Sequence, residues 1–114
     1  MDILTFKERV DLTIWRANAG PRWVRDRITR ANVLCLKKFN KSAVVTAWYK
    51  DSPFHNVLEA FDLRVNDLVV TAQQQYRTML CDDGIPAMLI DEGTDNAHIH
   101  VGDLATQKYE REYR

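Results

Sequence analysis

Four residues between positions 55 and 100 have the types and the spacing that a metal site requires. His55 and Asp62 lie seven residues apart in the segment SPFHNVLEAFDLR, and His98 and His100 alternate with apolar residues in the segment AHIHV. Zinc sites that catalyse hydrolysis use three nitrogen or oxygen ligands and keep one position open for water. His55, Asp62 and one of the two C-terminal histidines would supply two nitrogens and one oxygen. The chemistry expected of such a set is zinc-assisted hydrolysis.

This metal hypothesis depends on how residues 53–83 fold. Apolar residues recur there at helical spacing, which favours one long helix. Such a helix would separate His55 from Asp62 by about 10 Å along its axis, too far for two ligands that each lie about 2 Å from one ion. The alternative is a loop at His55, a strand over residues 59–65 that contains Asp62, and a helix over residues 66–84. A zinc site requires this second arrangement.

Two helices are expected in the first forty residues. Thr5 and Glu8 have the spacing of a capping box, and the apolar residues behind them recur at helical intervals until Gly20-Pro21 ends the helix. Pro21 suits the first turn of a second helix, which extends to about Asn40.

Short segments rich in apolar, β-branched and aromatic residues predict strands at residues 43–49, 85–91 and 97–101. Residues 59–65 add a fourth strand in the arrangement that a zinc site requires. The polar tail after residue 101 is either a short helix or frayed. Together these elements predict an α+β fold, in which N-terminal helices pack on a small, mainly antiparallel sheet crossed by one helix.

Length and composition predict a single domain over residues 1–114, with 46% apolar residues to form its core. No apolar run approaches the ~20 residues of a membrane span. The N-terminus lacks the apolar stretch of a secretion signal, so we expect a cytoplasmic protein without a membrane span. Cys35 and Cys81 lie outside any CxxC pair and are expected to be small buried residues.

Charge is divided unevenly along the chain. Residues 1–50 contain eleven Lys and Arg against four Asp and Glu, and residues 51–114 contain five against twelve. The two halves could attract each other within one domain, or the first half could bind an anionic partner such as nucleic acid. We favour the first interpretation because no nucleic-acid motif accompanies the basic residues.

Three segments resemble the zinc D-alanyl-D-alanine carboxypeptidase and L-alanyl-D-glutamate endopeptidase family, whose fold the hedgehog signalling domain shares. Residues 55–62 resemble its motif His-x-x-Gly-x-Ala-x-Asp, and AHIHV matches its His-x-His strand. Upstream, VVTAWYK is similar to the family's strand ending in Thr-Ser-x-Tyr-Arg, and Ser52 is similar to the serine just before the zinc histidine. Order and spacing agree over residues 43–101, roughly half of the chain, which would form the zinc core of a hedgehog/DD-peptidase-like fold.

The resemblance implies roles for individual residues of this chain. His55, Asp62 and His100 would bind Zn²⁺, and His98 would lie close to the metal-bound water or to the oxyanion of the transition state. The family also uses a carboxylate a few residues before the last ligand as general base. We expect Asp95 to take this role, with Glu92 and Asp91 behind it on the same turn. Two further residues, Lys50 and Ser52, would contact the substrate.

The chain departs from the family pattern at four places. Leu58 replaces the motif's glycine, Lys50 replaces the substrate-facing arginine, and Ala97 stands where many members carry the base. The segment between Ser52 and His55 is also one residue longer. A lysine lacks the planar fork with which arginine binds a carboxylate in two places.

The resemblance implies a hydrolase, a zinc metallopeptidase that cuts peptidoglycan stem peptides. It would act as a D-Ala-D-Ala carboxypeptidase or an L-Ala-D-Glu endopeptidase. A short enzyme without a secretion signal fits cell wall degradation in phage lysis, or delivery to the cell wall by a virion. The departures favour an alternative, a catalytically inactive member of the same fold that acts as a binding protein.

Overall fold

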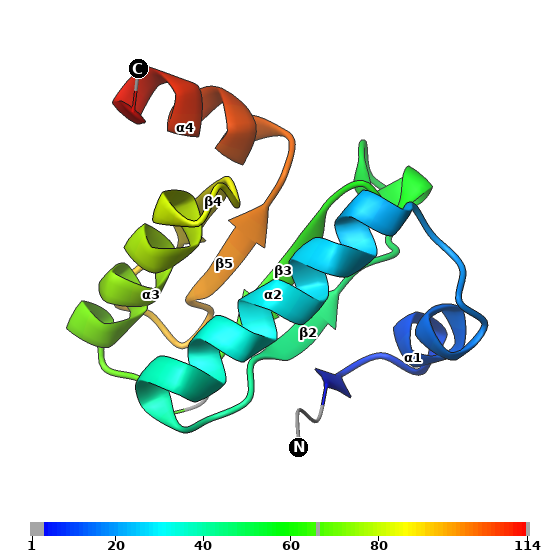
Figure 1. The fold of residues 1–114 in the computed structure, drawn as a ribbon, viewed down its shortest axis with the longest axis horizontal. Helices are drawn as coiled ribbons and strands as arrows, with labels where there is room; N and C mark the ends of the chain where they lie inside the picture. The colour runs from blue at the N-terminus through cyan, green and yellow to red at the C-terminus, as the bar shows by residue number, and fades with distance from the viewer. Residues whose placement is uncertain (1–3, 66, 114) are drawn as a thin grey trace.

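A five-stranded mixed sheet organises the chain (Figure 1). The computed structural model describes residues 4–65 and 67–113. Within these ranges the strands, in their order across the sheet, are β1 (Thr5–Phe6), β2 (Val44–Ala47), β3 (Phe61–Arg64), β5 (His98–Val101) and β4 (Ala87–Ile90). β1 runs parallel to β2, and the other neighbouring pairs are antiparallel.

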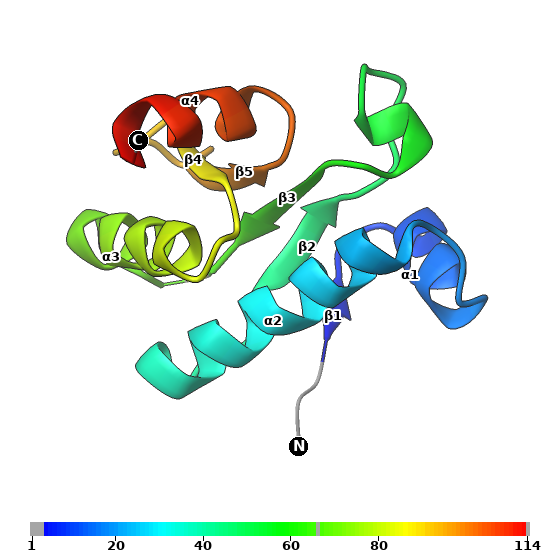
Figure 2. The ribbon, with the colours of Figure 1, turned by 45° about the horizontal axis from the view of Figure 1, so that its top comes forward.

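Helices cover both faces of this sheet. The helices found in the described ranges are α1 (Arg9–Arg16), α2 (Arg22–Phe39), α3 (Val70–Asp82), α4 (Leu104–Tyr113) and the short 3₁₀-helix η1 (His55–Val57). Figure 2 shows α2 and α3 on one side of the sheet and α4 on the other. None of the described helices is long and apolar enough to span a membrane. The predicted α+β class is confirmed.

The hydrophobic core lies between the sheet and helices α2 and α3. Val45, Leu63 and Ile99 are buried and stand opposite one another across β2, β3 and β5. An apolar stripe at helical spacing on α2 is fully buried and consists of Val24, Ile28, Ala31 and Cys35. Because side chains alternate along a strand, the residues between those core positions point to the opposite face of the sheet.

The prediction of one long helix over residues 53–83 is wrong. The chain forms η1, then β3, and α3 begins only at Val70. Phe61 and Leu63 are buried in β3 between β2 and β5, and this pairing outweighs the local helical spacing. The alternative of a loop followed by a strand is confirmed. The cap expected at Asn66 lies outside the described residues.

The start of the first helix was also predicted wrongly. Thr5 lies in β1 and pairs with Val44, so it is not part of a capping box. Glu8 precedes α1 without a side-chain cap, and β1 adds a fifth, parallel strand that the sequence did not predict. The other expected elements are confirmed, namely α2, β2, β4 and β5, and the tail forms α4.

Candidate metal centre

Three side chains from separate elements meet on the sheet face opposite the core. Asp62 on β3 is paired with His100 on β5, so their side chains emerge side by side on the same face. His55 reaches them from η1, which follows the β2 strand. One ligand atom from each of these three residues lies within 4.8 Å of the other two. The structure therefore brings together the three residues that the sequence predicted as metal ligands.

His55 is held with one ring nitrogen available to a metal. Its Nδ1–H donates a hydrogen bond to the carbonyl oxygen of Trp48 at 2.9 Å, since a carbonyl oxygen can only accept. The other nitrogen, Nε2, is buried without a hydrogen-bond partner and lies 3.6 Å from Asp62 Oδ1. Metal-binding histidines commonly donate the second N–H in this way, which fixes the tautomer and the ring orientation.

Asp62 is the centre of the cluster. Its Oδ1 accepts a hydrogen bond from His100 Nδ1 at 2.8 Å, and its Oδ2 accepts one from Lys50 Nζ at 3.0 Å. Burial on its own would raise the pKa of Asp62. The contacts with His100, His55 and Lys50 outweigh burial and hold the pKa of Asp62 well below its usual value. Asp62 is therefore an ionised carboxylate, as a metal ligand must be.

His100 lies between two carboxylates. Its hydrogen bond to Asp62 raises the pKa of His100 above the usual value, with a further contribution from Asp103, while burial opposes the shift. His100 Nε2 lies 3.3 Å from Asp103 Oδ2 but makes no hydrogen bond of good geometry. Asp103 was not among the predicted site residues, because only the turn after β5 places it beside the ring.

The three residues fit a zinc ion. Two imidazoles and one carboxylate form a common ligand set for catalytic zinc. Ligand atoms about 2 Å from a tetrahedral zinc lie about 3.3 Å from each other. The separations from Asp62 Oδ1, 2.8 Å to His100 Nδ1 and 3.6 Å to His55 Nε2, bracket this value. The unpartnered Nε2 of His55 would gain a bond that it lacks in the metal-free protein.

The loop that carries His55 turns at Leu58. Leu58 has φ 63° and ψ 25°, the left-handed conformation that favours glycine. Its carbonyl oxygen accepts a hydrogen bond from Trp48 Nε1 at 3.0 Å, and its side chain packs against the core. These contacts offset the cost of about 1–2 kcal/mol for a left-handed residue with a side chain. The chain therefore makes here the turn that glycine would allow.

A cleft of about 470 Å³ opens over the three ligands. The apolar side chains of Met88, Ile90 and Leu104 also line it, as does Ser52. A second cavity of about 330 Å³ adjoins it, because Lys50, Asp62 and His98 line both. All three ligands line the cleft; His55 and Asp62 are buried there and His100 is half-buried.

The other predicted residues lie at different distances from this cleft. His98 and His100 share one strand face, as predicted, and both line the cleft. The Nδ1 of His98 is hydrogen-bonded to the carbonyl oxygen of Asn96 at 2.8 Å. The buried Oγ of Ser52 has no hydrogen-bond partner.

The carboxylate expected as general base is not at the cleft. Asp95 is exposed, and its carbonyl oxygen accepts a hydrogen bond from Arg64. Among the described carboxylates of this turn, Asp91 lines the adjoining cavity, with Asp62 and His98. Asp91 has φ 54°, a backbone conformation that the sequence did not predict. The role of Asp95 stays a prediction, and Asp91 is a second candidate.

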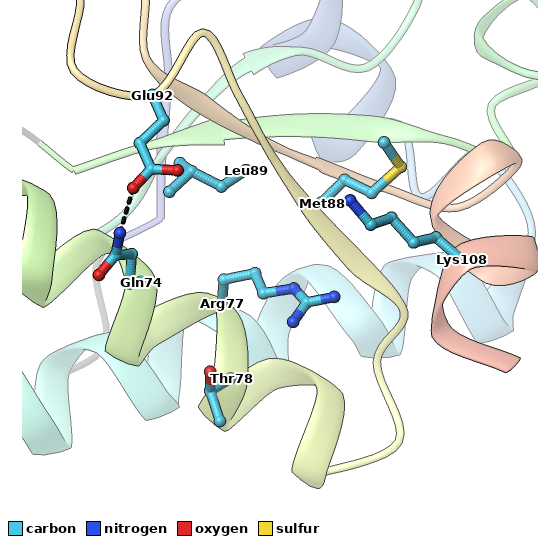
Figure 3. Close-up of a pocket in the computed structure, with 7 residues that line it drawn as sticks. All are labelled: Gln74, Arg77, Thr78, Met88, Leu89, Glu92 and Lys108. Carbon is cyan, nitrogen blue, oxygen red and sulfur yellow. Dashed lines mark hydrogen bonds between the residues drawn. The ribbon is translucent and has the colours of Figure 1, made fainter. Parts of the chain in front are cut away.

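A further cavity, of about 210 Å³, lies between α3, β4 and α4 (Figure 3). Arg77 and Lys108 contribute positive charge to it, and Glu92 in its wall accepts a hydrogen bond from Gln74. Met88 borders both this cavity and the cleft. Its described lining contains one carboxylate and no histidine or cysteine, so it lacks a set of metal ligands.

The basic residues of α2 make contacts within the chain. Arg25 stacks on the Trp15 ring at 4.1 Å, Arg30 pairs with Asp83 at 2.8 Å, and the Arg27 guanidinium lies 4.9 Å from the centre of the Trp23 ring. The Arg30–Asp83 pair joins the basic first half to the acidic second half, as one interpretation of the charge pattern predicted. Cys35 and Cys81 are buried and form no disulfide, as expected.

Comparison with protein-family models, curated proteins and solved structures found no match. The resemblance to the zinc DD-peptidase family therefore stays a prediction that rests on the residues and their arrangement.

Proposed function

We propose that this protein is a zinc-dependent peptidase that cuts peptidoglycan stem peptides. The observation that carries the proposal is the His55–Asp62–His100 cluster, in which His55 Nε2 has no hydrogen-bond partner and over which a cleft opens. Such a cluster supplies three protein ligands and leaves space for a water molecule and a substrate carbonyl. The order of the ligands along the chain agrees with the family motif.

Bound zinc would supply an activated water and polarise the scissile carbonyl. The chain's own residues would then position the substrate and move protons. His98 faces the cleft beside His100, and its Nδ1–H is already donated to the carbonyl oxygen of Asn96. It would therefore donate a hydrogen bond to the developing oxyanion from Nε2, in the imidazolium form that carries a proton on both nitrogens. A carboxylate of the turn after β4 would take the proton of the water, with Asp95 and Asp91 as candidates.

The shape of the cleft supports a peptide substrate. Met88, Ile90 and Leu104 form an apolar wall on one side of the ligands, and Lys50 lies on the rim that both cavities share. An apolar wall suits the methyl groups of alanine residues, and a cation suits the carboxylate of a stem peptide. The chain would reach the cell wall through phage lysis or a virion.

Two observations favour the alternative, a catalytically inactive binding protein of the same fold. Lys50 Nζ is 3.0 Å from Asp62 Oδ2, so a cation of the protein itself already neutralises the central ligand. Asp95 also lies outside the cleft lining. An inactive member would keep the cleft and bind stem peptides without cutting them.

Hydrolysis of purified peptidoglycan separates these two proposals. The zinc-loaded wild type should release free D-alanine if it is a carboxypeptidase, or new N-terminal D-glutamate if it is an endopeptidase. Asp91→Asn and Asp95→Asn form a matched pair on one turn, and the true base is the one whose loss abolishes release. Zinc-loaded protein that binds peptidoglycan but releases neither product would refute the peptidase and support the binding protein.

A further inference from the structure

We infer that Asp11, a buried residue of α1 outside the cleft, positions the metal ligand His55 through the backbone of Trp48. Asp11 is fully buried, and both oxygens of its carboxylate are hydrogen-bonded to backbone groups that are not part of the three ligands. The inference rests on the proposed metal centre, because it assigns Asp11 the task of holding one ligand ready for the ion.

Asp11 fixes the chain where it leaves β2. Its Oδ2 accepts a hydrogen bond from the N–H of Trp48 at 3.0 Å, and its Oδ1 accepts one from the N–H of Tyr49 at 2.8 Å. Both oxygens are thus used on two successive peptide groups. A buried polar group is costly unless it is hydrogen-bonded, so this arrangement is specific to an acceptor with two oxygens at this position.

Trp48 is hydrogen-bonded to the loop that carries the metal ligand His55. Its carbonyl oxygen accepts the Nδ1–H of His55, which leaves the lone pair of Nε2 directed toward Asp62. Its indole N–H is donated to the carbonyl oxygen of Leu58, at the far end of the same loop. Both ends of the loop that carries His55 are therefore attached to Trp48, and Asp11 holds the Trp48 peptide in place.

Asn32 offers a matched control within the same fold. It is also buried, and its Oδ1 accepts a hydrogen bond from the N–H of Ala43 at 3.0 Å, just before β2 begins. Asp11 and Asn32 thus perform the same structural task at opposite ends of β2. Asp11 alone of the two is linked to a metal ligand, so a purely structural role would make their substitutions equivalent.

The first test is the protonation of His55 in metal-free wild-type protein, read from the ¹⁵N shifts of its ring nitrogens by NMR. We expect the neutral ring to carry its proton on Nδ1. A neutral ring protonated on Nε2 would overturn the inference, whether or not the variants fold. This measurement needs no zinc, so it stands even if the proposed metal centre fails.

The second test compares Asp11→Ala with Asn32→Ala in zinc affinity, measured by competition with a chelating dye on folded protein. Loss of an outer hydrogen-bonding partner typically weakens a metal site by about 10–100-fold. We expect Asp11→Ala to raise the zinc Kd by about tenfold and to mix the two His55 tautomers, while Asn32→Ala changes neither. Equal zinc Kd values in Asp11→Ala and wild type, or equal losses in both variants, would overturn the inference. Wild-type protein that binds no zinc would instead refute the metal centre.

Discussion

Replacing Lys50 with methionine should weaken the metal-free fold and strengthen zinc binding. Lys50 Nζ lies 3.0 Å from Asp62 Oδ2, and Asp62 is the central ligand of the proposed site. In the metal-free protein this ammonium neutralises a buried carboxylate. A zinc ion at the site would take over that neutralisation, so Lys50 and the metal compete for the same charge. Methionine keeps the length of the side chain and removes the competitor.

The size of both effects follows from the same ion pair. Two unit charges 3.0 Å apart attract each other by about 5 kcal/mol at an effective dielectric constant of about 20. The Lys50 side chain is 47% exposed, so solvent screening and the loss of side-chain entropy reduce the net contribution to about 1 kcal/mol. Zinc binding to the wild type must give up the stabilisation that the Lys50–Asp62 pair provides. Lys50→Met has no such pair to give up, so its zinc binding should be stronger by the same free energy. A gain of about 1 kcal/mol corresponds to about fivefold tighter zinc binding.

Urea unfolding of the metal-free protein and a zinc titration against a chelating dye measure the two effects separately. Lys41→Met is the control, because Lys41 pairs with Asp67 at 3.9 Å on the exposed surface and should change neither quantity appreciably. Weaker zinc binding in Lys50→Met would refute the reasoning. It would mean that Lys50 holds Asp62 in place for the metal instead of competing with it.

Two further perturbations test the site and its support. The hydrogen bond between Asp62 and His100 stabilises the metal-free fold when Asp62 is ionised and His100 is protonated. Asp62 has a lowered pKa and His100 a raised one, so this contribution should be fully present between the ordinary values of 3.8 and 6.5. It should fall above pH 6.5, as the pH passes the raised pKa of His100, and in strong acid, as Asp62 becomes protonated. Urea unfolding of Asp62→Asn should lack the loss in acid and show a smaller loss above pH 6.5, because Asp103 still raises the pKa of His100. Zinc affinity should weaken by at least about tenfold per pH unit below the pKa of His100, since the metal displaces its proton; a pH-independent Kd would exclude His100 as a ligand. Gly20→Ala should destabilise the fold by about 2–3 kcal/mol in urea unfolding, because φ is +89° and the new Cβ would lie 2.7 Å from the Trp48 ring. Gly84→Ala, with φ +80° and nothing within 4 Å, should cost only about 1 kcal/mol, and equal losses would contradict the packing argument.

Residue types and regular structure predicted His55, Asp62 and one of the two C-terminal histidines as ligands, and the family resemblance implied that His100 is the third. Alternation along a strand places His98 and His100 on one face, and the spacing of His55 and Asp62 fits one ion only if the helix is broken. The buried stripe of α2 followed from helical periodicity in the same way. These features repeat at fixed intervals, so they can be counted along the chain.

The support of the site could not be predicted, because it depends on contacts between distant residues. Asp11 reaches Trp48 from 37 positions away, and only the packed fold brings α1 to the end of β2. The same holds for β1, whose two residues become a strand by pairing with β2. The position of Asp91 depends on its left-handed backbone conformation. This conformation is uncommon for residues other than glycine, so it could not be predicted from the sequence.

The zinc content of the purified protein tests the central claim most directly. We expect one zinc per chain in the wild type, measured by atomic emission after dialysis, and the same content in His98→Ala. His100→Ala should lose the metal, although it differs from His98→Ala only in which histidine of the same strand face is removed. Wild-type protein that contains no zinc, and takes up none when zinc is added, would contradict the account.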